Sequence, residues 1–283
     1  MPAIDLSGAT SDSHLVSLWL AARPESTRRV YEPVVLEFLA TLAGREGGLK
    51  TLTAAEVIEW AETLVGEPAT RARKVSTVKS LLSFAWRTGY CIYNVGRVLL
   101  GVPIPSKVSE RILEEPEVKS LMAGASEGRD RAFVRLMYAT GARVSELCKL
   151  RWVDMAQPGR VSVVGKGSKT RTLVVPQKIL DEVFALKPAG AALTDYVFTS
   201  KRSPGRALDP RDAREIIYRA RDAAGMTKKV CCHALRHSHA THSLDRGCKI
   251  HVLQQSLGHS NISTTSIYLH VRPNQGSAQF LDL

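Results

Sequence analysis

The 283-residue sequence has no long hydrophobic run. No stretch approaches the roughly 18 apolar residues that a membrane-spanning helix needs, so we expect no membrane partner. Its first 15 residues also lack a basic region followed by an apolar core, which is the mark of a secretory leader. The five cysteines are odd in number and follow no metal-binding spacing. These absences predict a cytoplasmic protein with free thiols.

Charge is unevenly distributed along the chain. Apolar residues make up 44% and charged residues 23%, which is typical of a globular protein long enough for two domains. The formal net charge is +12; residues 1–105 hold 11 basic and 10 acidic residues, and residues 106–283 hold 28 and 17. Residues 68–109 and 155–180 contain no acidic residue. Such basic surface attracts polyanions such as nucleic acid, although a merely solubilising surface is an equal alternative.

Helical patterns fill the first hundred residues. Ser26 is placed to cap a helix, Thr53–Glu56 forms a capping box for a second, and residues 69–88 form a third that Gly89 ends. We therefore expect residues 1–100 to be a small helical bundle with one basic surface. The apolar stripe expected on the first helix consists of Val30, Val34, Leu36, Phe38, Leu39 and Leu42.

A linker is predicted at residues 101–112, which hold two prolines and a glycine but no long periodic segment. Residues 113–283 then form a mixed domain. Two β-branched runs around Gly165–Ser168 predict a hairpin, and Asp209 with Pro210 predicts a helix start. The fold class is therefore mainly α with a small β-sheet. Helices are expected near 115–123, 129–140, 143–150, 210–223, 233–246, 249–257 and 263–270.

Seven of the eight histidines fall between residues 233 and 270. Because His233 and His237 are four residues apart on a predicted helix, they could share one zinc ion. A zinc hydrolase of the H-E-x-x-H type, however, needs a glutamate where this chain has Ala234. The fixed charge of Arg236 would also oppose a bound cation. A zinc site is therefore the lesser of two alternatives.

A phosphate site is the other interpretation of the same residues. Cleaving DNA without a metal requires a nucleophile, cations that neutralise charge on the phosphate, an acid for the leaving oxygen and a base. Arginine suits the second task because its planar fork meets two phosphate oxygens and stays charged. Each candidate residue alone is weak evidence for a phosphate site, but their joint occurrence in this order along the chain strengthens the interpretation. The side chains that this chain offers are Arg143, Lys166, Arg236, His259 and Tyr268.

These residues lie within motifs that together resemble the tyrosine recombinase (lambda integrase) family, in the style of its simple Xer-type members. The motifs span residues 140–270, and the helical first domain is similar to the family's core-binding domain in size and character. The matching segments are T-G-x-R-x-S-E-L (140–147), G-K-G-x-K-x-R (165–171), H-x-L-R-H (233–237), L-G-H (257–259) and I-S-T-T-x-I-Y (262–268).

The resemblance implies a role for each residue and an enzyme that needs neither metal nor ATP. Tyr268 would form a 3′-phosphotyrosyl bond, with Arg143 and Arg236 clamping the scissile phosphate. Lys166 would protonate the leaving 5′-oxygen and His233 would act as the base. The converging cations should also favour the phenolate form of the tyrosine. His259 would hydrogen-bond the phosphate, and Glu146 and His237 would support these groups.

The family also implies partners. Its members grip double-stranded DNA at paired inverted half-sites with one domain on each side, and act as tetramers through a Holliday junction. Because helices are expected from about residue 14, we expect a simple recombinase without an arm-binding domain. Phe280 and Leu281 are expected either to dock on a neighbouring subunit or to belong to a frayed tail. A type IB topoisomerase, a metal-dependent hydrolase and a purely DNA-binding protein are the alternatives.

Overall fold

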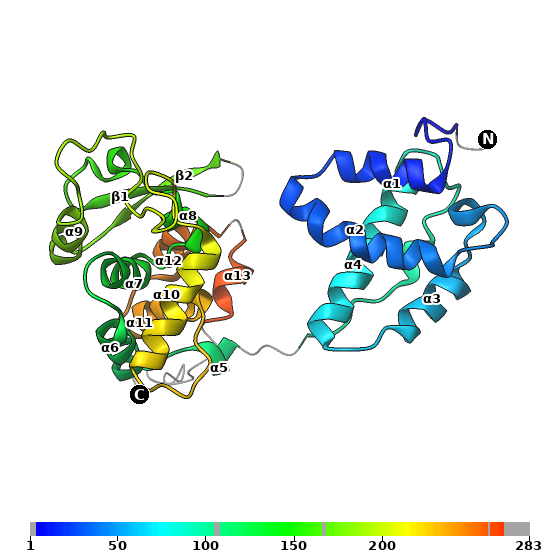
Figure 1. Cartoon of the computed structure of the whole chain (residues 1–283). Coiled ribbons are helices and arrows are strands. Elements are labelled where there is room, and N and C mark those ends of the chain that lie inside the picture. Colours follow the sequence, from blue (N-terminus) through cyan, green and yellow to red (C-terminus); the bar gives the residue numbers. More distant parts are fainter. Residues whose placement is uncertain (1–3, 105–107, 166–167, 260, 269–283) are drawn as a thin grey trace, which may run out of the picture. The chain divides into compact units, whose positions relative to one another are not determined.

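The computed structural model describes residues 4–104, 108–165, 168–259 and 261–268. The chain divides into two compact units, Met1–Pro105 and Ser106–Leu283 (Figure 1). Helices dominate both units, and the described part of the chain holds one two-stranded sheet. The predicted class, mainly α with a small β-sheet, is confirmed. Within the described ranges, no helix is both long and apolar enough to cross a bilayer.

Over its described residues, 4–104, the N-terminal unit is built from four α-helices with two short 3-10 turns. Its core is formed by side chains such as Trp19, Phe38, Val57 and Leu81, all of which are buried. Its elements are α1 (Asp12–Ala21), α2 (Glu25–Thr41), η1 (Gly48–Thr51), α3 (Ala54–Thr63), α4 (Pro68–Arg87) and η2 (Val95–Val98).

Two of the three predicted helix boundaries in this unit are confirmed. Thr53 and Glu56 form the expected capping box of α3, and Gly89, with φ at +77°, follows the end of α4. The predicted cap of α2 is wrong. Pro24 occupies the N-cap, and its carbonyl accepts from the backbone N–H of Arg28, so Ser26 lies inside the helix.

The apolar stripe of α2 is narrower than predicted. Val34, Val35 and Phe38 are buried, whereas Val30 and Leu36 are exposed. The helix packs mainly against α1 and α4, and its Phe38 also meets Trp60 of α3, so one face lies on the core while Val30 and Leu36 face solvent.

The C-terminal unit packs helices around a hairpin and a central helix, α7. In Figure 1 the hairpin lies at the upper edge of this unit, above α7 and α11. Its elements are α5 (Val108–Arg111), α6 (Glu115–Gly124), α7 (Arg129–Thr140), α8 (Val144–Cys148), η3 (Trp152–Met155), β1 (Arg160–Val164), β2 (Thr170–Val174), α9 (Gln177–Phe184), α10 (Pro210–Ala223), α11 (Cys232–Asp245), α12 (Ile250–Leu257) and α13 (Ser263–Ser266).

Most predicted elements of this unit are present. The antiparallel hairpin pairs Arg160 with Val174, and Asp209 caps α10 by accepting from a backbone N–H of its first turn. Helix α9 was not predicted: its eight residues are too few to repeat an apolar period clearly. Helix α5 lies within the predicted linker.

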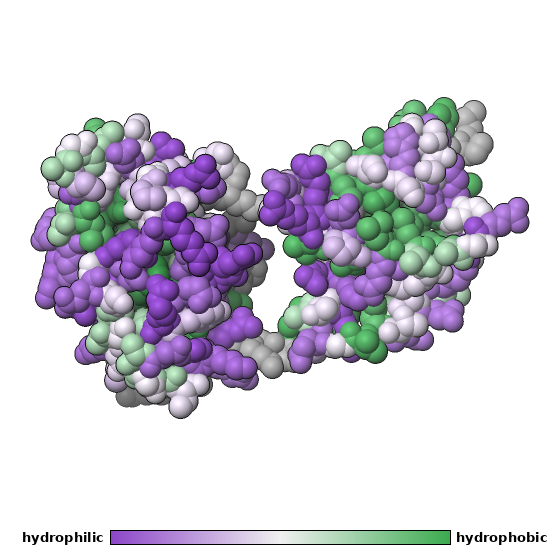
Figure 2. All heavy atoms as spheres, viewed as in Figure 1, coloured by the Kyte–Doolittle hydropathy of each residue, from purple (hydrophilic) through white to green (hydrophobic). Residues whose placement is uncertain are grey.

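Helix α7 positions the site, because it packs against α9 and α11 and most of its residues are buried. Phe133 of α7 meets Phe198 edge to face, with ring centroids 5.0 Å apart. A smaller apolar cluster joins Ala240, Leu253, Leu257 and Tyr268 beside this core. Hydrophilic side chains gather over the middle of the viewed face of this unit in Figure 2.

Candidate active site

Arg143 lies at the start of α8, where the chain turns sharply after α7. Gly141 makes this turn in the left-handed conformation, with φ at +58°. The backbone N–H of Arg143 donates to Oε2 of Glu146 at 2.8 Å, and its Nη1 donates to Oε1 at 3.0 Å. A single carboxylate therefore fixes both the backbone and the guanidinium of Arg143.

The same carboxylate binds a second arginine from the hairpin. Arg171 on β2 donates from Nη1 and Nη2 to the two oxygens of Glu146 at 2.9 and 2.7 Å, and from Nε to the Ser256 carbonyl at 2.7 Å. The side chain of Glu146 is only 3% exposed. Burial alone would raise the pKa of Glu146, but hydrogen bonds from Arg171 and Arg143 outweigh it and the net pKa is lowered. Glu146 is thus ionised and links α8 to β2, and its partner Arg171 extends this link to α12.

Arg236 of α11 is buried at the meeting point of two helix ends. Its Nη1 donates to the Gly141 carbonyl at 2.6 Å, and its Nη2 donates to the Leu257 carbonyl at 2.8 Å. The same Nη2 lies 2.8 Å from Nε2 of His259. Burial, followed by repulsion from Arg143, lowers the pKa of Arg236 to about 10, so its guanidinium stays charged at neutral pH.

His259 follows α12, which ends at Gly258 in the left-handed conformation. Because a guanidinium can only donate, Nε2 of His259 accepts from Arg236, and Nδ1 carries the hydrogen that reaches Oγ1 of Thr265 at 2.9 Å. Burial and then the charge of Arg236 lower the pKa of His259 to about 4. The ring is therefore neutral and held in one tautomer.

Tyr268 is buried, with 4% of its surface exposed, and its hydroxyl lies 2.9 Å from Nδ1 of His237. Burial, followed by the neighbouring His233, lowers the pKa of His237 to about 4. The imidazole is thus neutral and accepts the phenol hydrogen. Burial raises the pKa of Tyr268 and outweighs the opposing effect of Arg236. Arg236 thus acts in the direction expected from the sequence, but its charge does not overcome burial, and the phenol keeps its proton.

His233 lies one turn before His237 on α11, and their ring centroids are 6.3 Å apart. Its side chain is exposed, although partial burial and the charge of Arg236 lower its pKa. A hollow of about 620 Å³ opens beside Arg143, Arg171 and His259. Its other lining residues are Gly165, Lys169, Thr170, Gln255, Gly258 and Thr264.

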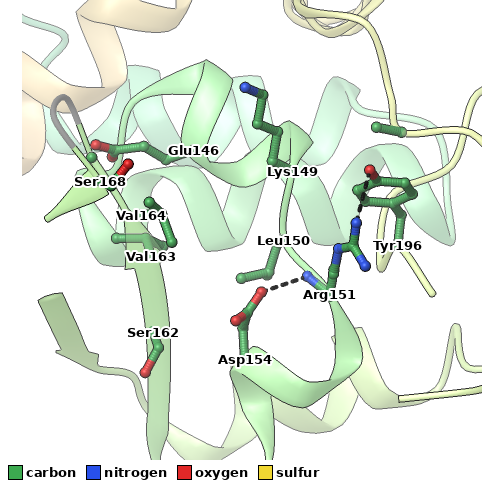
Figure 3. A pocket seen from close by; sticks show the side chains of 12 residues that line it. Glu146, Lys149, Leu150, Arg151, Asp154, Ser162, Val163, Val164, Ser168 and Tyr196 are labelled. Carbon is green, nitrogen blue, oxygen red and sulfur yellow. Dashed lines mark hydrogen bonds between the residues drawn. The ribbon is translucent and has the colours of Figure 1, made fainter. Parts of the chain in front are cut away.

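A second hollow, of about 550 Å³, lies on the β1 side of Glu146 (Figure 3). Of its two basic residues, Lys149 and Arg151, the second is already engaged: Nη2 of Arg151 donates to the Tyr196 hydroxyl at 3.2 Å, and its backbone N–H donates to Asp154 at 2.9 Å. None of the predicted cationic, histidine or tyrosine residues lines this hollow where the chain is described. The candidate site is therefore the hollow beside Arg143.

The structure brings together residues from widely separated parts of the sequence. Arg143 reaches the Gly258 carbonyl at 3.5 Å, next to His259 and the Arg236 contacts. Tyr268 joins this group through His237, and in the described ranges it makes no hydrogen bond to either arginine of the predicted clamp. Lys166 lies outside the described residues, as do Phe280 and Leu281.

Two members of the network had no assigned role in the sequence analysis. Arg171 is the last residue of the G-K-G-x-K-x-R motif, which was its only signal, and Thr265 lies in I-S-T-T-x-I-Y. The zinc alternative finds no support: among the described residues, no three His, Cys, Asp or Glu side chains are grouped so as to hold a metal ion.

Comparisons with known proteins place this geometry in a family. Residues 111–275 match the model of the phage integrase family, and residues 14–89 match that of the phage integrase N-terminal SAM-like domain. The chain is 34% identical to tyrosine recombinase XerC of Mycobacterium leprae (strain TN), over 92% of each protein. The chain belongs to the phage integrase family, the tyrosine site-specific recombinases. The predicted resemblance to Xer-type recombinases is confirmed.

Solved structures agree on the fold of this recombinase. A crystal structure of the XerH site-specific recombinase bound to palindromic difH substrate superposes with a TM-score of 0.75 at 22% identity, covering 94% of this chain and 83% of that one. A lambda integrase dimer bound to a core site gives 0.72 at 20% identity, covering 94% and 95%. At these identities the likeness concerns the fold.

Proposed function

We propose that this recombinase cuts and rejoins double-stranded DNA at paired inverted half-sites, through a 3′-phosphotyrosyl bond to Tyr268 and a Holliday junction. The observation that carries the proposal is Arg236, which joins the ends of α7 and α12 to His259 in one buried network. Such a preorganised cationic site stabilises the charge that develops on a phosphate under attack.

The two arginines have complementary parts in this proposal. Arg236 is buried and fixed by three acceptors, so it contributes a charge at a set position. The side chain of Arg143 is 35% exposed and its contact with the Gly258 carbonyl is long, so its fork remains available to phosphate oxygens. Nε2 of His259 accepts from Arg236 while Nδ1–H is directed to Thr265, so His259 positions the guanidinium, and it can donate to a phosphate oxygen only after Nε2 gains a proton.

The proposed reaction breaks one ester bond and forms another. The phenol oxygen of Tyr268 attacks phosphorus, its proton passes to His233 acting as base, and the 5′-oxygen leaves with a proton from Lys166. Because one phosphodiester replaces another, resealing needs no ATP. In this proposal Arg143 and Arg236, and no metal ion, neutralise the charge on the phosphate. The hydroxyl must first leave His237, since that imidazole holds its hydrogen in the structure described above.

The proposal includes the partners and the division of the chain. Residues 1–100 would bind the DNA core site, residues 101–112 would link the domains, and residues 113–283 would carry catalysis. The match of residues 14–89 to an integrase N-terminal domain supports the first assignment. A homo- or hetero-tetramer on DNA is proposed because a lambda integrase tetramer was solved on a Holliday junction. A cytoplasmic, nucleoid-associated location follows from this substrate.

A nicked suicide substrate tests the chemistry. The wild-type chain should form a covalent DNA adduct in the presence of a chelator, and Tyr268→Phe should form none while still binding DNA. Strand exchange between two marked duplexes then separates a recombinase from a type IB topoisomerase. An adduct that persists in Tyr268→Phe, or that requires a metal ion, would overturn the proposal.

The acid role of Lys166 has its own test. Replacing the bridging 5′-oxygen with sulphur gives a better leaving group that needs no proton. We expect Lys166→Ala to slow cleavage of the sulphur substrate much less than cleavage of the ordinary one. Equal slowing on both substrates would remove Lys166 from this role and leave the assignment of Tyr268 unaffected.

A further inference from the structure

A separate hollow of about 760 Å³, lined in part by His233, lies within the C-terminal unit. It is formed where α5, α10 and the approach to α11 meet, and it is rich in basic side chains. The lining residues are Glu110, Arg111, Tyr218, Arg221, Lys228, Lys229, Val230, Cys231 and His233. Of these lining residues, the mechanism proposed above uses His233 alone.

The basic residues of this hollow differ in their engagement. Lys228 donates to the Ile112 carbonyl at 2.6 Å and pairs with Glu117 at 3.2 Å, and Arg221 pairs with its neighbour Asp222. Arg111 and Lys229 make no side-chain hydrogen bond or ion pair with any residue in the described ranges, and both are exposed. The hollow therefore presents two uncommitted cations against Glu110.

This hollow adjoins the predicted catalytic residues, because His233, the proposed base, lines it directly. His233 is also one helical turn from His237, the partner of Tyr268. The charge of Arg111 contributes to the lowered pKa of both histidines, which places its guanidinium within electrostatic range of the phenol's surroundings. A polyanion lying in the active site would thus extend towards Arg111 and Lys229.

We infer that this hollow binds a second backbone phosphate of the cleaved strand, close to the scissile one, through Arg111 and Lys229. The inference rests on the proposed function, because it takes DNA as the ligand. Successive phosphates of one strand recur every 3.4 Å or so along the duplex axis, so a strand held at the scissile phosphate must pass charged groups on either side of it. Two free cations beside His233 are placed to neutralise one of them and to fix the register of the strand.

Methylphosphonate substrates test the inference one phosphate at a time. Each substrate replaces one charged phosphate near the cleavage position with a neutral one, and binding of the full chain is measured by titration. We expect one position at which the substitution weakens wild-type binding about tenfold but leaves the binding of Arg111→Gln/Lys229→Gln unchanged. Because each phosphate contact contributes about 0.9 to the salt dependence, the double variant should also show a shallower slope of log affinity against log salt.

The controls separate this site from general charge and from folding. Lys178→Gln removes an exposed charge from α9 without touching the hollow, and its methylphosphonate profile should match that of the wild type. The variant Arg111→Gln/Lys229→Arg keeps one of the two cations and should recover part of the affinity that the double variant loses. A double variant that stays as sensitive as the wild type at every phosphate would overturn the inference. Adduct formation by Tyr268 is scored separately, so its presence keeps the proposed function intact whichever result is obtained.

Discussion

The hydroxyl of Tyr268 and Nδ1 of His237 are 2.9 Å apart; Tyr268 lies in the apolar cluster beside α11, and His237 is half-buried. The tyrosine is therefore held by a neutral acceptor before it meets a phosphate. The hydrogen bond to His237 satisfies the buried hydroxyl of Tyr268, and burial raises the pKa of that hydroxyl. Chemistry requires the hydroxyl to exchange this partner for a phosphate.

Replacing His237 tests whether this contact positions the nucleophile. We expect His237→Phe to destabilise the fold by about 1–3 kcal/mol, because the buried phenol hydroxyl loses its acceptor, and to slow adduct formation about tenfold, because this contact no longer holds Tyr268 near Arg236 and His259. His237→Asn keeps an acceptor near the position of Nδ1 and should retain more of the rate. Single-turnover cleavage of a nicked substrate measures both variants. Equal rates for His237→Phe and the wild type would show that the contact has no positioning role.

Glu146 is expected to matter for both stability and rate. Glu146→Gln leaves Arg171 and Arg143 without their shared anion, and breaking a buried ion pair on one side costs about 3 kcal/mol or more. Adduct formation should fall at least tenfold, since the fork of Arg143 loses its support. Chemical denaturation and single-turnover cleavage measure the two effects.

Glu127 provides the matched control for Glu146. It pairs with Arg131 at 3.1 Å on the surface, where the Glu127 side chain is 86% exposed. Exposed pairs contribute about 0–1 kcal/mol, so Glu127→Gln should change neither stability nor cleavage appreciably. Similar losses in the two variants would contradict the central place given to Glu146.

Gly141 is crowded as well as left-handed. A Cβ there would lie 2.5 Å from Cδ2 of His239 and 3.0 Å from Cδ2 of Leu257. Gly141→Ala should therefore cost more than the roughly 1–2 kcal/mol of the backbone conformation alone, and it should displace the carbonyl that Arg236 binds. Gly225 has a similar φ of +64° but nothing within 4 Å of a Cβ, so Gly225→Ala isolates the conformational part. Equal destabilisation of the two variants would show that crowding at Gly141 is unimportant.

Local signals in the sequence were sufficient for much of the fold. The capping box at Thr53, the hairpin around Gly165–Ser168 and the cap at Asp209 depend on residues a few positions apart, and each is present as predicted. The start of α2 was predicted wrongly because Pro24 and Ser26 are both acceptable helix-start residues, and only the observed backbone distinguishes them.

The hydrogen-bond network of the site could not be predicted from the sequence, and the reason is different. Arg171 is 25 residues from Glu146 and 85 from Ser256 in sequence, so no spacing rule links the three. The partner of Tyr268 was likewise hidden, since His237 was predicted only as a supporting side chain. Burial, which sets the protonation of these groups, arises from packing between α11, α12 and α13 and is not encoded in any local pattern.

Acidification should destabilise the folded C-terminal unit because of three histidines. Burial is the largest cause lowering the pKa of His237, His239 and His259, in each case to about 4 from an ordinary value near 6.5. Between these values the unfolded chain binds protons that the folded chain does not, so the free energy of unfolding falls as the pH drops from about 6.5 to about 4. Above 6.5 both states are neutral at these positions, and the stabilising contribution is fully present.

The size of this effect can be measured by chemical denaturation of the full chain at a series of pH values. In the middle of the window each histidine contributes a slope of up to about 1.4 kcal/mol per pH unit. His259→Gln should reduce the slope by the share of one group, because glutamine takes up no proton in either state. A His259→Gln slope as steep as that of the wild type would mean that His259 is already protonated when folded, and a charged ring could not accept the hydrogen bond from Arg236 on which the phosphate site is built.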